Sequence, residues 1–345
     1  MIIDTDLRVR VLGSAKAVPD GGPVSNVEIL STDPELRAKG ADFLKRMSDR
    51  IESRFGVRER YLVHKPWQTT QAHEDSSEDL AFRALRRALS VEGKGSPALL
   101  VHGTTTSSRY TGSQAASILG RLGIVAPAYE IKAGCSTSIA SLHMALAFLK
   151  SGYSDVAVAC GETLSKVMDP ENRETWFGLA DGGAALWLGK DDSAPDFAIL
   201  KSYYCTDGLY SDLFTTRGGL PPTAAECESN LYSLRGDADR LRTVSRERYT
   251  TMLAEIFPPE FPLSAIDWVV PHQVNRELIQ NVMKEHRISA KVVWNAREYG
   301  NLGGASVLFS MADSLERGLF RTGDRILLMS VGGGLSFAAQ VWQKL

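Results

Sequence analysis

The stretch at residues 131–152, IKAGCSTSIASLHMALAFLKSG, sets Cys135 in a turn of small residues directly before a strong helical pattern. From Ser138 onward apolar residues cover most of a helix, and Gly152 is placed where a helix ends. A helix that is apolar nearly all round is expected to be buried. The N–H groups and the positive dipole at its start favour the thiolate of Cys135, so we expect a nucleophile, with a buried packing cysteine as the simpler alternative.

The composition bounds the class of protein. With 345 residues, 43% hydrophobic and 23% charged, the chain is expected to form one large or two medium globular domains. A net charge of -2 argues against a general nucleic-acid binder. The 4 cysteines and 6 histidines show neither a C-x-x-C pair nor a ligand cluster, which predicts no metal site, no disulfides and a reducing, cytoplasmic setting.

No export or membrane signal is found at the N-terminus. Asp4 and Asp6 stand where a signal peptide needs basic residues, and no run approaches the roughly 18 apolar residues of a membrane span. We therefore expect a protein that is neither exported nor embedded in a membrane.

Strand and helix patterns alternate along the chain, which predicts an α/β fold with a mainly parallel sheet. Strands are expected at residues 7–13, 97–101, 155–160, 194–205, 266–271 and 325–331. Helices are expected at residues 41–54, 76–89, 114–122, 138–152 and 305–317, and residues 181–184 are expected to form a tight turn into a further strand.

The chain carries a weak internal repeat. His102 and His272 each follow a short apolar strand pattern. The separation from His102 to Cys135 is nearly the same as that from His272 to Asn301. Each of these two residues is then followed by a helix and a strand, which predicts a duplicated α/β unit. Because ligands gather at the carboxyl ends of strands in open α/β sheets, we expect Cys135, His272 and Asn301 to converge.

A cysteine at a helix start, a histidine at a strand end and an asparagine before a helix suit acyl transfer through a thioester. The segment SVGGGLS at residues 330–336 is expected to bring a backbone N–H near the thiol, since glycine permits close approach. With the N–H of Cys135 it would form an oxyanion hole; a simple tight turn is the alternative interpretation.

Four segments, GCSTSIASLHMAL, DWVVPHQVNREL, YGNLGGASVLFSMADSLERG and SVGGGLSFAA, resemble the signature segments of the β-ketoacyl-acyl-carrier-protein synthase III family of the thiolase-like superfamily. RFGVRERYL, SEDLAFRALRRAL and LADGGAALWLG extend the resemblance to essentially the whole chain. It implies a thiolase-like fold of two duplicated α/β halves in a five-layered αβαβα arrangement, and a homodimer. The halves would be residues 1–190, with the cysteine, and 191–345, with the histidine and asparagine.

The resemblance also implies the roles of the site residues. Cys135 would take an acyl group from a coenzyme A or carrier-protein thioester, with Gly333 as the partner of its own N–H in the oxyanion hole. His272 and Asn301 would bind the thioester carbonyl of a malonyl group on acyl carrier protein. Decarboxylation and condensation would then give a β-ketoacyl product and carbon dioxide for fatty acid or related biosynthesis, with no metal or redox cofactor.

Three positions bear on the acyl substrate. Arg50 stands where family members usually have a tryptophan that stacks on coenzyme A, which favours a carrier-bound or unusual acyl donor. Arg54 matches an arginine that contacts the coenzyme A or phosphopantetheine region. Thr111 stands near the place of a phenylalanine that often limits chain length, so a longer or aromatic acyl chain is an option.

Alternatives remain open at this point. The chain could be a specialised condensing enzyme or acyltransferase of a polyketide, resorcinol or quinolone-type pathway, or a subunit of a heteromeric synthase. A cysteine hydrolase is a further option, because Cys, His and Asn occur in that order in papain-like proteases. The arginines at residues 235–248 are either a docking face for an acidic carrier protein or a solvated helix face.

Overall fold

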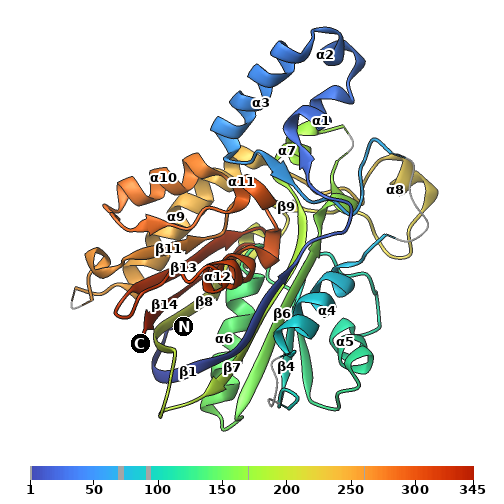
Figure 1. The fold of residues 1–345 in the computed structure, drawn as a ribbon. Helices are drawn as coiled ribbons and strands as arrows, with labels where there is room; N and C mark the ends of the chain where they lie inside the picture. The colour runs from blue at the N-terminus through green and yellow to red at the C-terminus, as the bar shows by residue number, and fades with distance from the viewer. Residues whose placement is uncertain (1, 69–73, 91–94, 170, 260) are drawn as a thin grey trace.

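The fold is known from a computed structural model that describes residues 2–68, 74–90, 95–169, 171–259 and 261–345 (Figure 1). The strands of its large sheet are β1 (Ile2–Ala17), β4 (Leu100–Gly103), β5 (Ala128–Ile131), β6 (Asp155–Thr163), β7 (Asp181–Lys190), β8 (Phe197–Thr206), β11 (Trp268–Pro271), β12 (Lys291–Val292), β13 (Arg325–Gly332) and β14 (Ser336–Lys344). Two small ribbons pair β2 (Val24–Ser25) with β3 (Glu59–Arg60) and β9 (Phe214–Thr215) with β10 (Arg235–Gly236).

The helices are α1 (Asn26–Ser31), α2 (Pro34–Ala38), α3 (Ala41–Phe55), α4 (Ser77–Ala88), α5 (Gln114–Leu122), α6 (Thr137–Lys150), α7 (Arg173–Gly178), α8 (Ala224–Glu228), α9 (Ala238–Ile256), α10 (Arg276–Glu285), α11 (Ala296–Tyr299) and α12 (Ser306–Glu316). Short 3-10 turns lie at Leu164–Val167, Gly208–Tyr210, Leu263–Ala265 and Gly303–Ala305. The helices α1, α2 and α3 form a small lobe at the top of the molecule in Figure 1.

The large sheet is built twice from the same pattern. Its strand order is β12-β11-β13-β14-β8-β1-β7-β6-β4-β5. From the central pair outward, the first half runs β1, β7, β6, β4, β5, and the second half runs β8, β14, β13, β11, β12, which is the same order in chain terms. β7 ends at Lys190 and β8 begins at Phe197. This repetition confirms the predicted duplication of the α/β unit, and the boundary between the halves at residue 190 stays a prediction.

The expectation of a mainly parallel sheet is wrong. β4–β5, β4–β6, β11–β12 and β11–β13 are parallel, whereas β1–β7, β1–β8, β6–β7, β8–β14 and β13–β14 are antiparallel. Parallel neighbours need a long crossover, but a hairpin can join antiparallel strands through a few residues. The short glycine turn between β13 and β14 makes such a hairpin, so the last strand of the half reverses direction.

The helices and the two halves of the large sheet stack in five layers, as the family resemblance implied. α6 packs on β4 and β6 of the first half and on β8, β13 and β14 of the second, while α12 packs on β1 and β7 as well as on β11 and β13. α4 and α5 cover the outer face of the first half, and α9 and α10 cover that of the second (Figure 1). The apolar sides of α6 and α12 therefore share one core between the halves, with Ile139, Leu142, Val307 and Phe309 fully buried.

The tight turn expected at residues 181–184 is also wrong, because β7 begins at Asp181. Gly182 and Gly183 pair with β6, and Gly183 leaves no room for a side chain: a Cβ there would lie 2.6 Å from the carbonyl of Leu80 in α4. Glycine in a strand can mark a close backbone approach as well as a turn. Here it lets a buried helix lie directly on the strand.

Candidate active site

Cys135 lies in a tight turn between β5 and α6. Gly134 has φ +53, the left-handed conformation that glycine adopts at little cost. The N–H groups of Ser136 and Thr137 donate to the carbonyl oxygens of Ala133 and Gly134, both at 3.1 Å. These bonds close the turn and present the thiol to the loop between β13 and β14.

That loop, Gly332 to Gly334, packs directly on Cys135. A Cβ on Gly332 would lie 2.5 Å from the backbone nitrogen of Cys135, so only glycine fits. The N–H groups of Gly333 and of Cys135 itself are both placed to donate to the sulfur, and these hydrogen bonds act to lower the pKa of the thiol. The two amides that the sequence suggests for an oxyanion hole therefore lie together beside the sulfur.

The electrostatics of the thiol differ from the expectation. Burial, followed by the charge of Glu162, raises the pKa of Cys135 to about 11, so the prediction of a thiolate at rest is wrong. The helix start does not offset this effect, since α6 begins at Thr137 and the first N–H groups after Cys135 donate to carbonyl oxygens of the turn. The sulfur thus receives little from the helix start, and Cys135 is a thiol at neutral pH.

His272 follows the last residue of β11 and is 1% exposed. Its backbone N–H donates to the carbonyl oxygen of Met329 at 2.8 Å, but among the described residues neither ring nitrogen has a hydrogen-bond partner. Burial lowers the pKa of His272 to about 4, so the ring is neutral near pH 7 and keeps one N–H to donate. Buried polar groups are rarely left unpaired, so these nitrogens point to a ligand.

Asn301 is 4% exposed and follows α11 through Gly300, whose φ is +73. Its Oδ1 accepts from the N–H of Gly303 at 2.9 Å, and its backbone bonds to Gly178 and Ala180 at 2.9 Å. The bond from Gly303 fixes which end of the amide is oxygen. The other end, Nδ2, is left as a hydrogen-bond donor in a fixed direction.

The segments that carry Cys135, His272 and Asn301 meet at the start of α12. The Ser138 hydroxyl of α6 donates to the carbonyl oxygen of Gly304, three residues after Asn301. The N–H of Gln273, next to His272, donates to the Ser306 hydroxyl at 3.3 Å. The structure thereby brings together the three segments that the sequence singled out.

Glu162, at the end of β6, was not singled out from the sequence. It accepts hydrogen bonds from the N–H groups of Thr105 and Thr106 at 2.8 and 3.1 Å and from both hydroxyls. A Cβ on Gly304 would lie 2.5 Å from its Oε1, so this carboxyl group supports the Asn301 turn and the loop after β4. Burial raises the pKa of Glu162 to about 7. An acidic residue two positions after an apolar strand pattern, at residues 155–160, was the signal that could have found it.

Arg54 and Thr111 lie outside this buried cluster. Arg54 is exposed in the last turn of α3, with its guanidinium 5.2 Å from the centre of the Phe55 ring, and Arg50 is exposed one turn earlier. Thr111 is exposed in the loop between β4 and α5. Their roles in substrate binding stay predictions.

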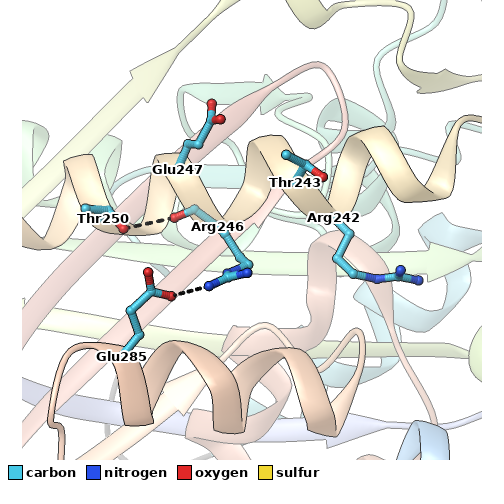
Figure 2. Close-up of a pocket in the computed structure, with 6 residues that line it drawn as sticks. All are labelled: Arg242, Thr243, Arg246, Glu247, Thr250 and Glu285. Atoms are coloured by element: carbon cyan, nitrogen blue, oxygen red, sulfur yellow. Dashed lines mark hydrogen bonds and ion pairs between the residues drawn. The ribbon is translucent and has the colours of Figure 1, made fainter.

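Most arginines of the 235–248 segment are paired with acidic side chains. Figure 2 shows Arg246 reaching across from α9 to Glu285 of α10, at 3.0 Å, beside Arg242. Arg242 contacts Asp239 at 2.8 Å, and Arg248 contacts Asp207 at 2.6 Å. This pairing offsets much of the positive charge and favours the interpretation as a solvated helix face.

Comparison with known proteins agrees with this fold. The family model for 3-oxoacyl-[acyl-carrier-protein (ACP)] synthase III matches residues 129–208, and the model for its C-terminal part matches residues 260–344. The chain is 31% identical over 297 residues to β-ketoacyl-[acyl-carrier-protein] synthase III 2 of Streptomyces coelicolor, covering 85% of this chain and 84% of the relative. It is 28% identical over 342 residues to the synthase III of a Ruegeria species, covering 97% and 98%.

Solved structures show the same fold. The 3-oxoacyl-(acyl carrier protein) synthase III of Pseudomonas aeruginosa matches with a TM-score of 0.82 at 23% identity over 98% of each chain. The corresponding enzyme of Aquifex aeolicus matches with a TM-score of 0.80 at 24% identity over 97% of this chain and 99% of that one. These matches show a thiolase-like fold. The family models and the Streptomyces coelicolor relative identify a condensing enzyme, an acyltransferase, and set aside the papain-like alternative. The chain belongs to the β-ketoacyl-[acyl-carrier-protein] synthase III family.

Among the described residues, no helix is both long enough and apolar enough to span a membrane.

Proposed function

We propose that the protein condenses an acyl group, carried on Cys135, with a malonyl group on an acyl carrier protein. The observation that carries the proposal is the buried, unpartnered imidazole of His272 in a segment that meets those of Asn301 and Cys135. The Cys135 thiol can hold the acyl group as a thioester, and the two neutral donors, His272 and Asn301, can bind a thioester carbonyl.

In the first step the Cys135 sulfur attacks the carbonyl carbon of the acyl donor. The N–H groups of Gly333 and Cys135 would bind the oxygen that becomes negative in the tetrahedral intermediate. When the intermediate collapses, the bond from carbon to the donor sulfur breaks and acyl-Cys135 remains. The proton lost by the Cys135 thiol ends on the departing thiol, so that the step creates no net charge.

In the second step the malonyl thioester loses carbon dioxide. The bond between the methylene carbon and the carboxylate breaks, and its electron pair forms an enolate whose oxygen is bound by the N–H of His272 and Nδ2 of Asn301. A neutral imidazole suits this role, because an imidazolium could protonate the carbanion. The low pKa of His272, about 4, keeps the ring in that form.

In the third step the enolate carbon attacks the carbonyl carbon of acyl-Cys135. A carbon–carbon bond forms, the carbon–sulfur bond breaks, and the Cys135 sulfur leaves as a thiolate that takes up a proton from water. The products are a β-ketoacyl thioester and carbon dioxide. The chemistry needs no metal or redox cofactor, since the electron pair comes from the bond broken in decarboxylation.

The donor and the carrier would approach over the small lobe. Arg50 and Arg54 lie one turn apart and exposed on α3, and the Cβ of Arg276, four residues after His272, lies 2.9 Å from a Cβ placed on Gly56. Positive charge at this edge suits the phosphates of coenzyme A or of a phosphopantetheine arm. The arm would lead inward toward His272.

The proposal includes a homodimer in the cytoplasm. β5 is an edge strand of the sheet, and it exposes Tyr129 to 47%, stacked 5.0 Å from Phe148, while the neighbouring helix α6 exposes Met144 to 40%. An edge strand with exposed apolar side chains invites pairing with a second copy. Cys135, Cys160, Cys205 and Cys227 are free thiols, in keeping with a reducing compartment.

The test is intact-protein mass after incubation with acyl groups from short to long, each on coenzyme A and on carrier protein, with Cys135→Ala alongside. An adduct on the native protein alone, followed by carbon dioxide release from malonyl carrier protein, is expected. A protein that no donor labels would contradict the proposal and favour a missing partner subunit. The preferred donor separates a fatty acid enzyme from the alternative, a specialised enzyme of a polyketide, resorcinol or quinolone-type pathway.

A further inference from the structure

Gln273, the residue after His272, is 1% exposed, and both the nitrogen and the oxygen of its side-chain amide form hydrogen bonds. Its Nε2 donates to the carbonyl oxygen of Val293 at 3.2 Å and to the Ser310 hydroxyl at 2.8 Å. Its Oε1 accepts from the N–H of Ala296 at 2.6 Å. The N–H of Ala296 can only donate and the carbonyl oxygen of Val293 can only accept, so these two partners fix the orientation of the Gln273 amide.

The partners of Gln273 flank Asn301 on both sides in the chain. Ala296 is the first residue of α11, the one-turn helix that ends at Tyr299 and leads through Gly300 to Asn301. Ser310 lies on α12, which follows the Asn301 turn. One side chain thus joins the residue beside His272 to the segments before and after Asn301.

A buried polar network holds these partners in turn. The Ser310 hydroxyl lies 3.0 Å from Oδ1 of Asn295, and Nδ2 of Asn295 lies 3.4 Å from Asp313. Asp313 forms ion pairs with Lys16 and, at 3.3 Å, with Arg317. A connected network of this kind holds each group in one orientation, because any movement leaves a buried polar atom unpaired.

We propose that Gln273 is a positioning residue that sets His272 and Asn301 at the separation needed to bind one thioester oxygen. The inference rests on the proposed function, and it concerns only the step in which the malonyl group is bound and decarboxylated. Cys135 is linked to the Asn301 segment through the Ser138–Gly304 bond, but its turn and the Gly332–Gly334 loop hold it without any bond to Gln273. Loss of the Gln273 bonds should therefore impair decarboxylation and leave acylation of Cys135 intact.

The test compares the two half-reactions in the full-length protein. Gln273→Met keeps the length of the side chain but neither donates nor accepts as an amide does, and Ser310→Ala removes one partner as a milder change. Gln340→Met is the matched control: Gln340 is also fully buried and bonded on both sides of its amide, to Ser202 and Trp342, each at 2.9 Å. Acylation is followed by intact mass, decarboxylation by carbon dioxide release from malonyl carrier protein, and folding by thermal unfolding.

Gln273→Met is expected to lower carbon dioxide release by about tenfold to a hundredfold, as small displacements of catalytic groups do, and to change the acylation rate less than twofold. Ser310→Ala should lower release by a smaller factor with acylation again unchanged, which keeps the proposal testable if Gln273→Met does not fold. Equal losses of acylation and carbon dioxide release in Gln273→Met would overturn the proposal. So would a loss of carbon dioxide release alone in Gln340→Met. If the native protein itself releases no carbon dioxide, the proposed function fails instead.

Discussion

Gly134 and Gly333 meet backbone to backbone: a Cβ on Gly134 would lie 2.0 Å from the carbonyl oxygen of Gly333. The contact joins the turn that presents Cys135 to the loop that supplies the second N–H. The side chain of Ser136, directly before α6, stabilises the same junction, since its hydroxyl donates to the carbonyl oxygen of Ser336 at 2.8 Å. The arrangement of thiol and amides is therefore held by residues from both halves of the chain.

Gly134→Ala should abolish acylation of Cys135, because the methyl group must displace the amide of Gly333 from the sulfur. Gly152→Ala is a matched control: Gly152 also has positive φ, at 111°, but a Cβ there meets nothing within 4 Å. Both variants carry backbone strain of about 1–2 kcal/mol, and only the first should lose the adduct in intact-mass measurements. Acylation of Gly134→Ala at the rate of the control would contradict the contact.

The rate of alkylation of Cys135 should keep rising with pH. With a thiol pKa of about 11, the thiolate fraction grows tenfold for each pH unit between pH 7 and pH 10. Iodoacetamide labelling followed by peptide mass spectrometry measures this rate, and Cys135→Ser identifies the labelled site. A plateau below pH 8 would show instead that the start of α6 stabilises the thiolate.

Glu162→Gln should change how the stability depends on pH. The pKa of Glu162 is 4.5 in its ordinary state and about 7 when buried, so the folded protein binds the extra proton between these values. Its contribution is therefore fully present below pH 4.5 and is lost as the pH rises through 7, by about 3 kcal/mol at 1.36 kcal/mol per pKa unit. Glutamine has no charge to titrate and should not show this loss.

Urea unfolding of both proteins at pH 5 and pH 8 measures the difference. Asp181, whose pKa burial raises to about 6, titrates in the same direction, but it is common to both proteins and cancels in the comparison. Parallel stability curves for the two proteins would show that Glu162 stays charged throughout.

The residues that we propose to carry the chemistry could be selected from the sequence because each lies at a boundary between local patterns. Cys135, His272 and Asn301 follow strand patterns or precede helix patterns, and boundaries of this kind are encoded by nearby residues. The direction of β7 and the extended backbone at Gly183 could not be found, since they depend on contact with α4, far away in the chain. The raised pKa of Cys135 likewise depends on burial and on Glu162, which only tertiary packing brings close.

Asn301→Asp tests the direction of the amide with the least change of shape. The bond from Gly303 to Oδ1 can persist, but the donor Nδ2 is replaced by an oxygen that cannot donate and that repels a developing enolate. Carbon dioxide release from malonyl carrier protein should fall by about 10²–10³-fold, while acylation of Cys135 should change only a few-fold. Asn281→Asp makes the same chemical change at an exposed position of α10 and should leave both half-reactions as they are. If Asn301→Asp releases carbon dioxide at the native rate, then Nδ2 does not bind the thioester oxygen, and His272 must act with a different partner.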